Sequence, residues 1–574
     1  MRGLPLRRRP AIVGLIGAAL LLSPLIGACA AVPTSGPIYQ GEDVGVEEPN
    51  QVIRVIARPP RAGMTPTEIV SGFIEASASF EDDHAVARQY LTPSAAALWD
   101  AGAGGDVYEG VPTIAPDGLT SVNLTATKTG TIEGDGRYEV AAIGRLVDLS
   151  FSLEFLDGEW RIANPPPGLL LSRSDVDRAY RAYDVYFFDP TFSTLVPDSR
   201  LFPISGPSAA TALVRALTAG PSQWLAPAVR SGLPEGTTLA VDAVPVIEGI
   251  ARVDFDPALR LADDATRRAI SAQVVWTLGQ APGVRFVDLN AGGQPLNVPG
   301  ASSPQPMNSW PEVDPNRMPG GTTPYGIVYG RAVKLDGTAP IPVSGGAGLA
   351  SPPLSGIAVS LDAQVIAGLD AEARLWTAPL RSGGASVLAI DEPGLSRPSY
   401  GGGEAPWVVN AEGSVLRAEA DGTTFTVPID GLSSKATVES ISVSRDGTRA
   451  ALIVRRGERS FVMVAVIALR EGLPRLQAPI RVDNRLNAVN DVAWADADTL
   501  AILGADGASS PAIYLVDMGR WQVRSIGAPA NPGRIAAAPG ADFLSSDVEG
   551  WIYSFTNGPW LRQIRATSPA YPGN

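Results

Sequence analysis

The chain has 574 residues, of which 45% are hydrophobic, and this length is enough for about three or four domains with cores of their own. Its 45 Lys and Arg residues stand against 59 Asp and Glu residues, and a net charge of -14 without a cation-rich segment argues against a nucleic-acid partner. The single histidine, His84, and the single cysteine, Cys29, exclude an intramolecular disulfide and a zinc cluster of Cys and His ligands.

Catalytic motifs are equally scarce. A Ser-His-Asp triad could use only His84, and the sequence contains neither a G-x-S-x-G nucleophile elbow nor the glycine-rich motifs that bind phosphates. We therefore predict a protein that is not an enzyme and that carries no cofactor or metal.

The amino terminus, residues 1–28, has the layout of an export signal. Arginines precede an apolar run from Ala11 to Ile26, and its length of about 16 residues is short of the roughly 20 that a spanning helix needs. The run ends in Ile-Gly-Ala-Cys29, which resembles a bacterial lipobox. This resemblance implies cleavage before Cys29, diacylglyceryl transfer to its thiol, and acylation of the new amino group with palmitate. Residues 29–50, rich in proline and small residues, are predicted to form a tether.

Residues 51–195 are predicted to form an α+β domain that begins with helices. The segment Thr-Pro-Thr-Glu predicts a helix with Thr65 as its N-cap and Pro66 at its first position. Two further helices are expected near His84–Tyr90 and Pro93–Ala101.

A sheet is expected to follow these helices. Apolar residues alternate with polar ones from Leu149 to Phe155, and Asp157-Gly158 then predicts a hairpin turn into Trp160–Ile162. Helices followed by a meandering sheet are reminiscent of NTF2-like cones, an analogy at the level of the fold only.

Residues 200–300 alternate between helical and strand patterns. Matches at Gly220-Pro221, Leu233–Thr237, Gly249–Asp254 and Gln273–Leu278 make this stretch similar to the GerMN domain of cell-envelope proteins, which implies an interaction module without enzymatic chemistry. The elements expected here are helices at Ala209–Thr218 and Ala265–Leu278, and strands at Leu239–Val246, Ile250–Phe255 and Val284–Leu289.

The carboxy-terminal part is repetitive. Residues 301–324 are so rich in proline that they predict a linker, or a belt across a neighbouring domain. Residues 325–574 then show a repeat of roughly 40 to 50 residues with several short strands each, which indicates a β-propeller of five blades, or of six with the last one closed by strands from both ends. The repeats begin near Ile357, Pro398, Ile441, Val492 and Ile535.

Three groups of side chains are candidates for a specific role. His84 is expected to be an exposed residue at a helix start. Asp254 and Asp256 share one side of a strand, so they form either an acid and base pair or an exposed strand end. Four tryptophans of the propeller region are expected to pack between blades, with anchoring of a partner as the alternative: Trp376, Trp407, Trp494 and Trp551.

The order of lipobox, α+β domain, GerMN-like domain and propeller, read together, points to one family. Matching residues occur at Cys29–Pro37, Gly72–Ile74, Ala87–Thr92, Trp160–Ile162 and Tyr183–Pro190, and the chain resembles the actinobacterial LpqB lipoprotein family from residue 26 onward.

This resemblance implies an accessory lipoprotein of the Mtr two-component system. Such a protein would be anchored to the cell membrane through lipid on Cys29, on the extracytoplasmic face, and would modulate a sensor histidine kinase by contact with its extracytoplasmic domain. The alternative is an envelope receptor that binds a small cell-wall fragment in a domain pocket or in the propeller channel.

Overall fold

The computed structural model describes residues 57–80, 82–204, 208–320, 322–337, 339–381, 383–403, 405–507, 509–520 and 522–573. These residues belong to one compact unit, which comprises residues 53–574. The predicted signal sequence, the lipobox at Cys29 and the tether lie outside the described residues. None of the helices in the described part of the chain has both the length and the apolar character needed to cross a bilayer.

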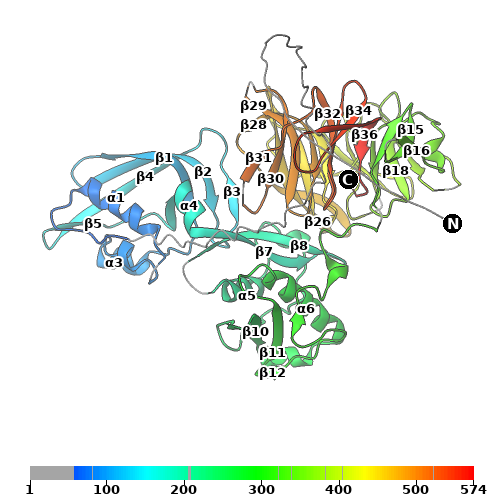
Figure 1. The fold of residues 1–574 in the computed structure, drawn as a ribbon. Coiled ribbons are helices and arrows are strands. Elements are labelled where there is room, and N and C mark those ends of the chain that lie inside the picture. The colour runs from blue at the N-terminus through cyan, green and yellow to red at the C-terminus, as the bar shows by residue number, and fades with distance from the viewer. Residues whose placement is uncertain are drawn as a thin grey trace, which may run out of the picture. The chain divides into compact units, whose positions relative to one another are not determined.

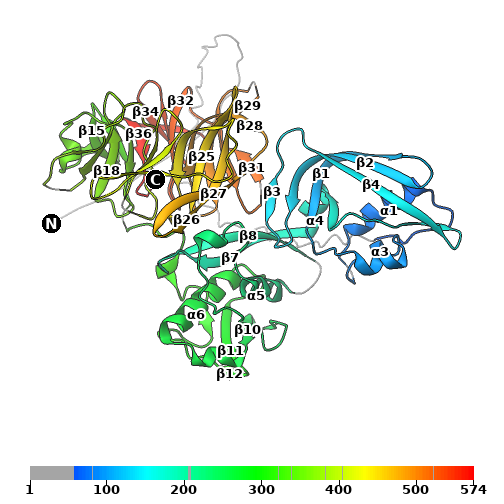
Figure 2. The ribbon, with the colours of Figure 1, turned by 180° about the vertical axis from the view of Figure 1, so that it is seen from behind.

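The first domain packs helices against a six-stranded sheet with strand order β5-β4-β2-β1-β6 and β3 beside β2 (Figures 1 and 2). Most neighbouring strands are antiparallel, and β1 and β6 are parallel. Its elements are α1 (Pro66–Ser77), α2 (Ala85–Arg88), α3 (Pro93–Leu98), β1 (Gly105–Pro116), β2 (Ser121–Ile132), β3 (Tyr138–Val140), β4 (Leu146–Leu156), β5 (Glu159–Ile162), β6 (Leu169–Ser172) and α4 (Arg173–Ala179).

Local sequence signals of this domain act as predicted. The Thr65 side chain accepts a hydrogen bond from the backbone of Glu68, whose carboxylate bonds back to the Thr65 backbone, so a capping box starts α1. Asp157 and Gly158 have φ angles of 51° and 86°, as a tight turn between β4 and β5 requires. The buried rings of Phe73 on α1 and Phe151 on β4 meet at 6.4 Å in the core.

The second domain joins a two-stranded hairpin to a small mixed sheet with two helices. Strands β10 and β11 are parallel neighbours, and Ile270, Val274 and Leu278 of α6 are buried as their spacing predicts. Its elements are β7 (Tyr180–Phe188), β8 (Leu195–Pro203), α5 (Ala209–Ala219), η1 (Ala226–Ala228), β9 (Val246–Ile247), β10 (Ile250–Phe255), η2 (Pro257–Leu261), α6 (Asp264–Leu278), β11 (Phe286–Ala291), β12 (Gln294–Pro295) and β13 (Gln305–Pro306).

One strand predicted in this domain is wrong in most of its length. Of residues 239–246, Leu239 forms an isolated bridge to β10, and Val246 pairs with β10 as the first residue of β9. The segment between them is held by helix α5, because Asp242 forms an ion pair with Arg215 and the Val244 amide donates to the Thr211 hydroxyl. Its backbone bonds to β10 are limited to its two ends, at Ala240 and Pro245.

The proline-rich segment lies against the second domain as a belt. Strand β13 pairs with β11, and Trp310, which is 4% exposed, accepts a hydrogen bond at its carbonyl from the indole of Trp276 on α6. A short 3-10 turn, η3 (Pro311–Val313), follows. The segment therefore completes the core of the second domain.

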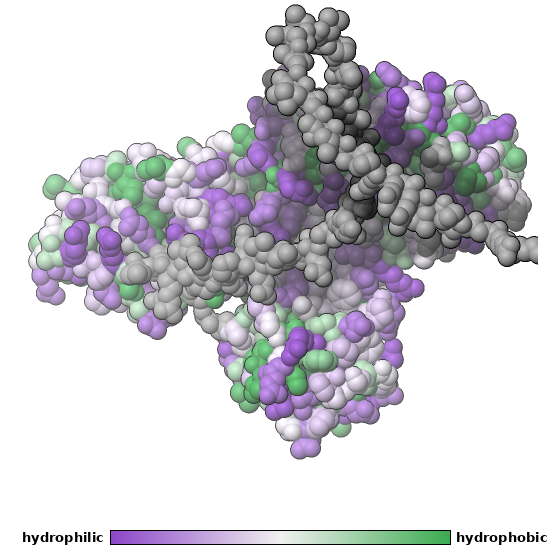
Figure 3. Space-filling model, in the orientation of Figure 1, coloured by the Kyte–Doolittle hydropathy of each residue, from purple (hydrophilic) through white to green (hydrophobic). Residues whose placement is uncertain are grey.

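The third domain is a propeller in which the described residues form six sheets, which settles the choice between five and six blades. The first sheet combines β14–β16 with the carboxy-terminal strand β36, so strands from both ends close the ring. In the third sheet, residues around Ser399 bridge to β21 in place of a fourth regular strand. Hydrophilic and apolar residues are interspersed over the face shown in Figure 3.

The strands of the six sheets are β14 (Tyr325–Val328), β15 (Arg331–Asp336), β16 (Ala339–Pro342) and β36 (Thr567–Ala570); β17 (Ser355–Val359), β18 (Val365–Leu369), β19 (Leu375–Pro379) and β20 (Val387–Ile390); β21 (Trp407–Val409), β22 (Val415–Ala418) and β23 (Thr424–Val427); β24 (Thr437–Val443), β25 (Arg449–Arg456), β26 (Arg459–Arg470) and β27 (Leu473–Arg481); β28 (Leu486–Trp494), β29 (Thr499–Asp506), β30 (Ala512–Asp517) and β31 (Gln522–Ser525); and β32 (Pro532–Ala536), β33 (Phe543–Asp547), β34 (Trp551–Phe555) and β35 (Leu561–Arg565).

Candidate functional site

The tip of the β7–β8 hairpin is fixed by one buried carboxylate. Asp189, which is 5% exposed, accepts hydrogen bonds from the backbone amides of Thr191 at 2.9 Å and of Ser193 and Thr194 at 2.7 Å. Between these amides, Phe192 is held at a φ of 59°, a left-handed conformation that costs a non-glycine residue about 1 kcal/mol or more. The Asp189 bonds offset this cost, and 46% of Phe192 remains exposed.

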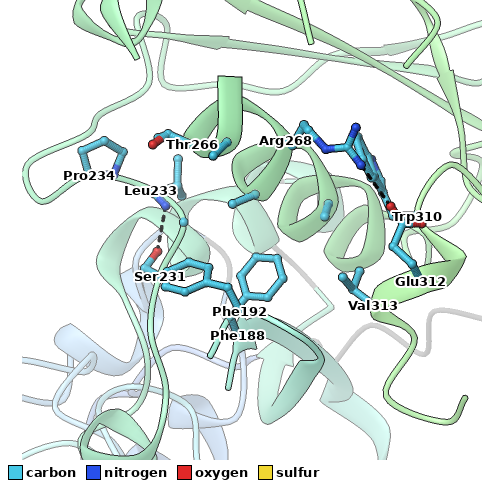
Figure 4. A pocket seen from close by; sticks show the side chains of 14 residues that line it. Phe188, Phe192, Ser231, Leu233, Pro234, Thr266, Arg268, Trp310, Glu312 and Val313 are labelled. Atoms are coloured by element: carbon cyan, nitrogen blue, oxygen red, sulfur yellow. Dashed lines mark hydrogen bonds and ion pairs between the residues drawn. The ribbon is translucent and has the colours of Figure 1, made fainter. Parts of the chain in front are cut away.

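Phe192 stands at the edge of an apolar pocket of about 650 Å³ in the second domain (Figure 4). Its ring packs on that of Phe188, with the centroids 5.1 Å apart, below helix α6. The pocket lies between the hairpin tip, the loop after Arg230, the exposed start of α6 and the belt. Its lining residues are Phe188, Phe192, Ser231, Gly232, Leu233, Pro234, Ala265, Thr266, Arg268, Ala269, Ala272, Trp310, Glu312 and Val313.

Charged side chains occur only at the belt end of this pocket lining. The Arg268 guanidinium lies over the Trp310 ring at 5.0 Å and forms a 3.3 Å ion pair with Glu312 (Figure 4). It also donates to the carbonyl of Pro299 at 3.2 Å. Because the cation and the carboxylate neutralise one another, this end of the pocket offers both a donor and an acceptor but no net charge.

The propeller axis, the other place predicted to hold a ligand, is crossed by arginine side chains. Arg397 donates to the carbonyls of Ile357, Ile535 and Pro569 at 3.0–3.1 Å and pairs with Asp491 at 3.3 Å, which joins the inner strands of four sheets. Burial lowers the pKa of Arg397.

A second arginine crosses the same axis. Arg445 donates to the carbonyls of Trp494 and Ala537, at 3.0 and 2.8 Å. The axis is therefore occupied by protein groups at Arg397, whereas Arg445 lines a pocket of about 610 Å³.

Carboxylates from two domains meet where the second domain contacts the propeller. The Trp224 indole donates to the carbonyl of Ala478 on β27 at 2.8 Å, and Asp184 of β7 approaches Asp498 in the turn between β28 and β29. Burial raises the pKa of Asp184 to about 6, although the Ser199 hydroxyl that donates to it acts in the opposite direction. Burial, and next the charge of Asp184, raise the pKa of Asp498 to about 9.

His84 differs from its predicted environment. It lies at the start of α2, as expected, but only 6% of it is exposed, so the prediction of an exposed residue is wrong. Its ring packs edge-on against Phe80 and Trp99, with centroids 5.0 and 5.8 Å away, and burial lowers its pKa. The neighbouring aromatic rings therefore place His84 in the core of the first domain, beside the backbone of Ser77 and Ser79 and the charge of Asp83.

Asp254 and Asp256 do not act on one another. The Asp254 carboxylate accepts from the Gly293 amide at 3.0 Å, whereas Asp256 accepts from the amides of Ala258 and Thr238 at 2.9 and 3.1 Å. Each carboxylate fastens a different turn next to β10, and neither lines the pocket. The structure thus contradicts the acid and base pair and favours the strand-end interpretation.

The four propeller tryptophans divide into two groups. Trp407 and Trp494 are 5% and 1% exposed, which confirms them as core residues. Trp376 is half-buried and donates to Asp370 at 2.8 Å, and the half-buried Trp551 ring stacks under Arg562 at 4.6 Å. The Trp376 and Trp551 rings therefore each contact a polar side chain of their own sheet.

The sequence matches three family models. Residues 59–177 match the N-terminal domain of lipoprotein LpqB, residues 184–297 match a domain described as sporulation and spore germination, and residues 330–572 match the LpqB beta-propeller domain. A curated lipoprotein LpqB from Thermobifida fusca is 32% identical, with 96% of this chain and 97% of the relative covered. The chain belongs to the LpqB lipoprotein family.

A second LpqB relative and one solved structure are also similar to this chain. The lipoprotein LpqB of Mycolicibacterium smegmatis is 30% identical over 86% of each chain. Among solved structures, TolB from Acinetobacter baumannii is similar at a TM-score of 0.35 and 15% identity, covering 58% of this chain and 98% of that one.

The pocket itself was not predicted from the sequence. Asp189 and Phe192 lie in the run Asp-Pro-Thr-Phe-Ser-Thr, in which an Asp followed by Pro, Ser and Thr is a recognisable turn signal. No local signal reveals that Trp310, which follows more than a hundred residues later, completes the same pocket.

Proposed function

We propose that this LpqB-family chain is a lipoprotein anchored to the extracytoplasmic face of the cell membrane through Cys29, and that it modulates a sensor histidine kinase of a two-component system by protein contact. The observation that carries this proposal is the family membership along nearly the whole chain, together with the lipobox-like Ile-Gly-Ala-Cys29. The partner surface would be the extracytoplasmic domain of the kinase.

The chemistry of the described residues supports a role without catalysis. The imidazole of His84 is enclosed by aromatic rings, and the carboxylates of Asp254 and Asp256 are bonded to backbone amides. Within the described ranges, no group of three His, Cys, Asp or Glu side chains is placed to hold a metal ion. A regulator that acts through its surfaces needs none of these groups.

A second candidate function is that of an envelope receptor for a small cell-wall fragment. The observation that favours it is the pocket of about 650 Å³ in the second domain, a size typical of small-molecule sites. The Arg397 side chain crosses the propeller axis and disfavours the channel at that level as the place for such a fragment.

The lipid anchor is tested by Cys29→Ala in cells. We expect the variant to lose acylation and cleavage, and to accumulate as precursor or to leave the membrane fraction, because only the thiol can form the thioether. A mass shift on labelling with an alkyne fatty acid measures this directly. Lipidation of the variant at the wild-type level would contradict the anchor.

The regulatory contact is tested with the acylated full-length chain and the full-length kinase in one lipid nanodisc preparation. We expect saturable binding and a changed rate of kinase autophosphorylation. Absence of both effects would contradict the proposed function. A change in autophosphorylation that appears only after addition of a muropeptide would favour the receptor.

A further inference from the structure

The pocket of the second domain is built to stay apolar and accessible. Asp189 accepts three backbone amide bonds in a turn that holds Phe192 in a left-handed conformation, with nearly half of this residue exposed to solvent. An exposed aromatic residue in a fixed, strained conformation is a feature of binding sites, because a folding core does not need it. Figure 4 shows the Phe192 and Phe188 rings facing the underside of α6 across the pocket.

The polar groups of the pocket set the chemistry of its occupant. The Ser231 hydroxyl accepts from the Leu233 amide and can still donate its own O–H, and the Thr266 side chain bonds to Asp263. The remaining polar side chains of the lining are the neutral pair of Arg268 and Glu312. A sugar has more hydroxyls than Ser231, Arg268 and Glu312 can pair, so the others would be buried against apolar surface without hydrogen bonds, at a cost in free energy.

A peptide fits the same lining. An amide group has one donor and one acceptor, which match Glu312 and Arg268, and an aromatic or branched aliphatic side chain matches the phenylalanines, Leu233 and Val313. A free carboxylate would be attracted by Arg268 and repelled by Glu312, and an ammonium group would be attracted by Glu312 and repelled by Arg268. The pair therefore gives a charged group little net attraction to offset its desolvation, and an uncharged segment is favoured.

We infer that this pocket binds an uncharged peptide segment of the partner's extracytoplasmic domain, with one aromatic or branched aliphatic side chain inserted between Phe192 and helix α6. The inference rests on the proposed function and names the surface through which the contact with the kinase is made.

The test uses two variants that narrow or open the pocket in the full-length acylated chain. Ala265→Trp adds a large side chain at an exposed position in the first turn of α6. Phe192→Ala removes the aromatic ring at the edge of the pocket. The matched control is Tyr329→Ala, because Tyr329 is another exposed aromatic residue with a left-handed backbone, at a φ of 50° in the propeller. Unfolding transitions establish that all three variants fold.

Two measurements are made on each variant. The first is the dissociation constant for the kinase in nanodiscs, which we expect to rise at least tenfold for Ala265→Trp and Phe192→Ala and to stay unchanged for Tyr329→Ala. The second is saturation-transfer NMR with N-acetyl-phenylalaninamide and with N-acetylglucosamine as probes. We expect a signal from the first probe only, and we expect Ala265→Trp to abolish it.

The outcomes separate the two proposals. If the wild-type chain binds the kinase and Ala265→Trp binds it equally well, the pocket assignment is overturned while the regulatory function stands. If the wild-type chain does not bind the kinase at all, the proposed function fails and the inference fails with it. A signal from N-acetylglucosamine without one from N-acetyl-phenylalaninamide would overturn the peptide assignment in favour of the receptor.

Discussion

The propeller axis and the pocket of the second domain differ in how their polar groups are paired. At the axis, Arg397 satisfies three backbone carbonyls and one carboxylate from four sheets. In the second domain, an aromatic residue is held in a strained conformation beside a cavity, and a carboxylate, Asp184, is buried against other carboxylates.

This difference separates a stabilising region from a binding region. A ring of sheets has a hole at its centre, and charge-assisted bonds to inner-strand carbonyls close it and tie the sheets together. Backbone strain and an apolar cavity lower the free energy of unfolding of a domain. They are therefore retained where they contribute to the binding of a partner. Three substitutions test whether the two regions differ in this way.

The largest effect is expected at the axis. Arg397→Ala removes a buried cation from three carbonyls and from Asp491, which keeps the Ile535 amide at 2.9 Å and Arg534 at 3.7 Å. This loss should lower the free energy of unfolding by about 3 kcal/mol. Denaturant unfolding followed by tryptophan fluorescence measures this loss. Arg331→Ala, at an exposed position on β15, is the control and should change stability by less than about 0.5 kcal/mol. Wild-type stability of the Arg397 variant would show that the axis contributes nothing to holding the sheets together.

An intermediate effect is expected at the hairpin tip. Asp189→Ala removes the acceptor of three amides and should cost about 2 kcal/mol, because the lost bonds involve a buried charged group. It should also release Phe192 from its left-handed conformation and weaken partner binding as Phe192→Ala does. The comparison is Asp421→Ala, in which a fully exposed carboxylate fastens a similar turn at Thr423, and we expect unchanged binding there. Equal binding by Asp189→Ala and wild type would mean that the position of Phe192 is irrelevant to the partner.

The sequence predicts the architecture better than the site. Periodic segments with strong signals appear where they are expected, such as α1 behind its Thr65 cap, α6 with its buried face, and the innermost strands of four sheets. Predictions fail where distant partners decide the outcome. Residues 239–246 bond to helix α5, and aromatic neighbours from both sides enclose His84. The pocket depends on residues from the hairpin, α6 and the belt, and periodicity carries no information about their meeting.

The smallest effect, expressed per pH unit, is expected for the pH dependence of the free energy of unfolding at the contact between the second domain and the propeller. The groups that face one another there are Asp184, Asp198, Asp314, Asp496, Asp498, Asp517 and Arg449. Asp198 pairs with Arg200 at 2.6 Å, Asp517 pairs with Arg520 at 3.8 Å, and Arg449 is bonded to Asp446 at 2.6 Å. The ion pairs of the described residues leave Asp184 and Asp498 without a cation of their own. The raised pKa of Asp498 keeps this carboxyl protonated near neutral pH, which lowers the cost of burying it beside Asp184.

The sign of the pH dependence follows from the raised pKa values. Between the ordinary pKa of 3.8 and the raised pKa of about 9, Asp498 keeps its proton in the folded chain and releases it on unfolding. The free energy of unfolding should therefore fall as pH rises through this window, by roughly 1 kcal/mol per pH unit at most for one proton, and Asp184 should add to the fall up to about pH 6. Calorimetric unfolding from pH 5 to 9 measures the slope. Asp498→Asn, which keeps the shape without the titration, should flatten the slope, whereas Asp336→Asn on the exposed end of β15 should leave it as in wild type. An equal pH slope in both variants would mean that the carboxylates of this contact are ionised and solvated in the folded chain.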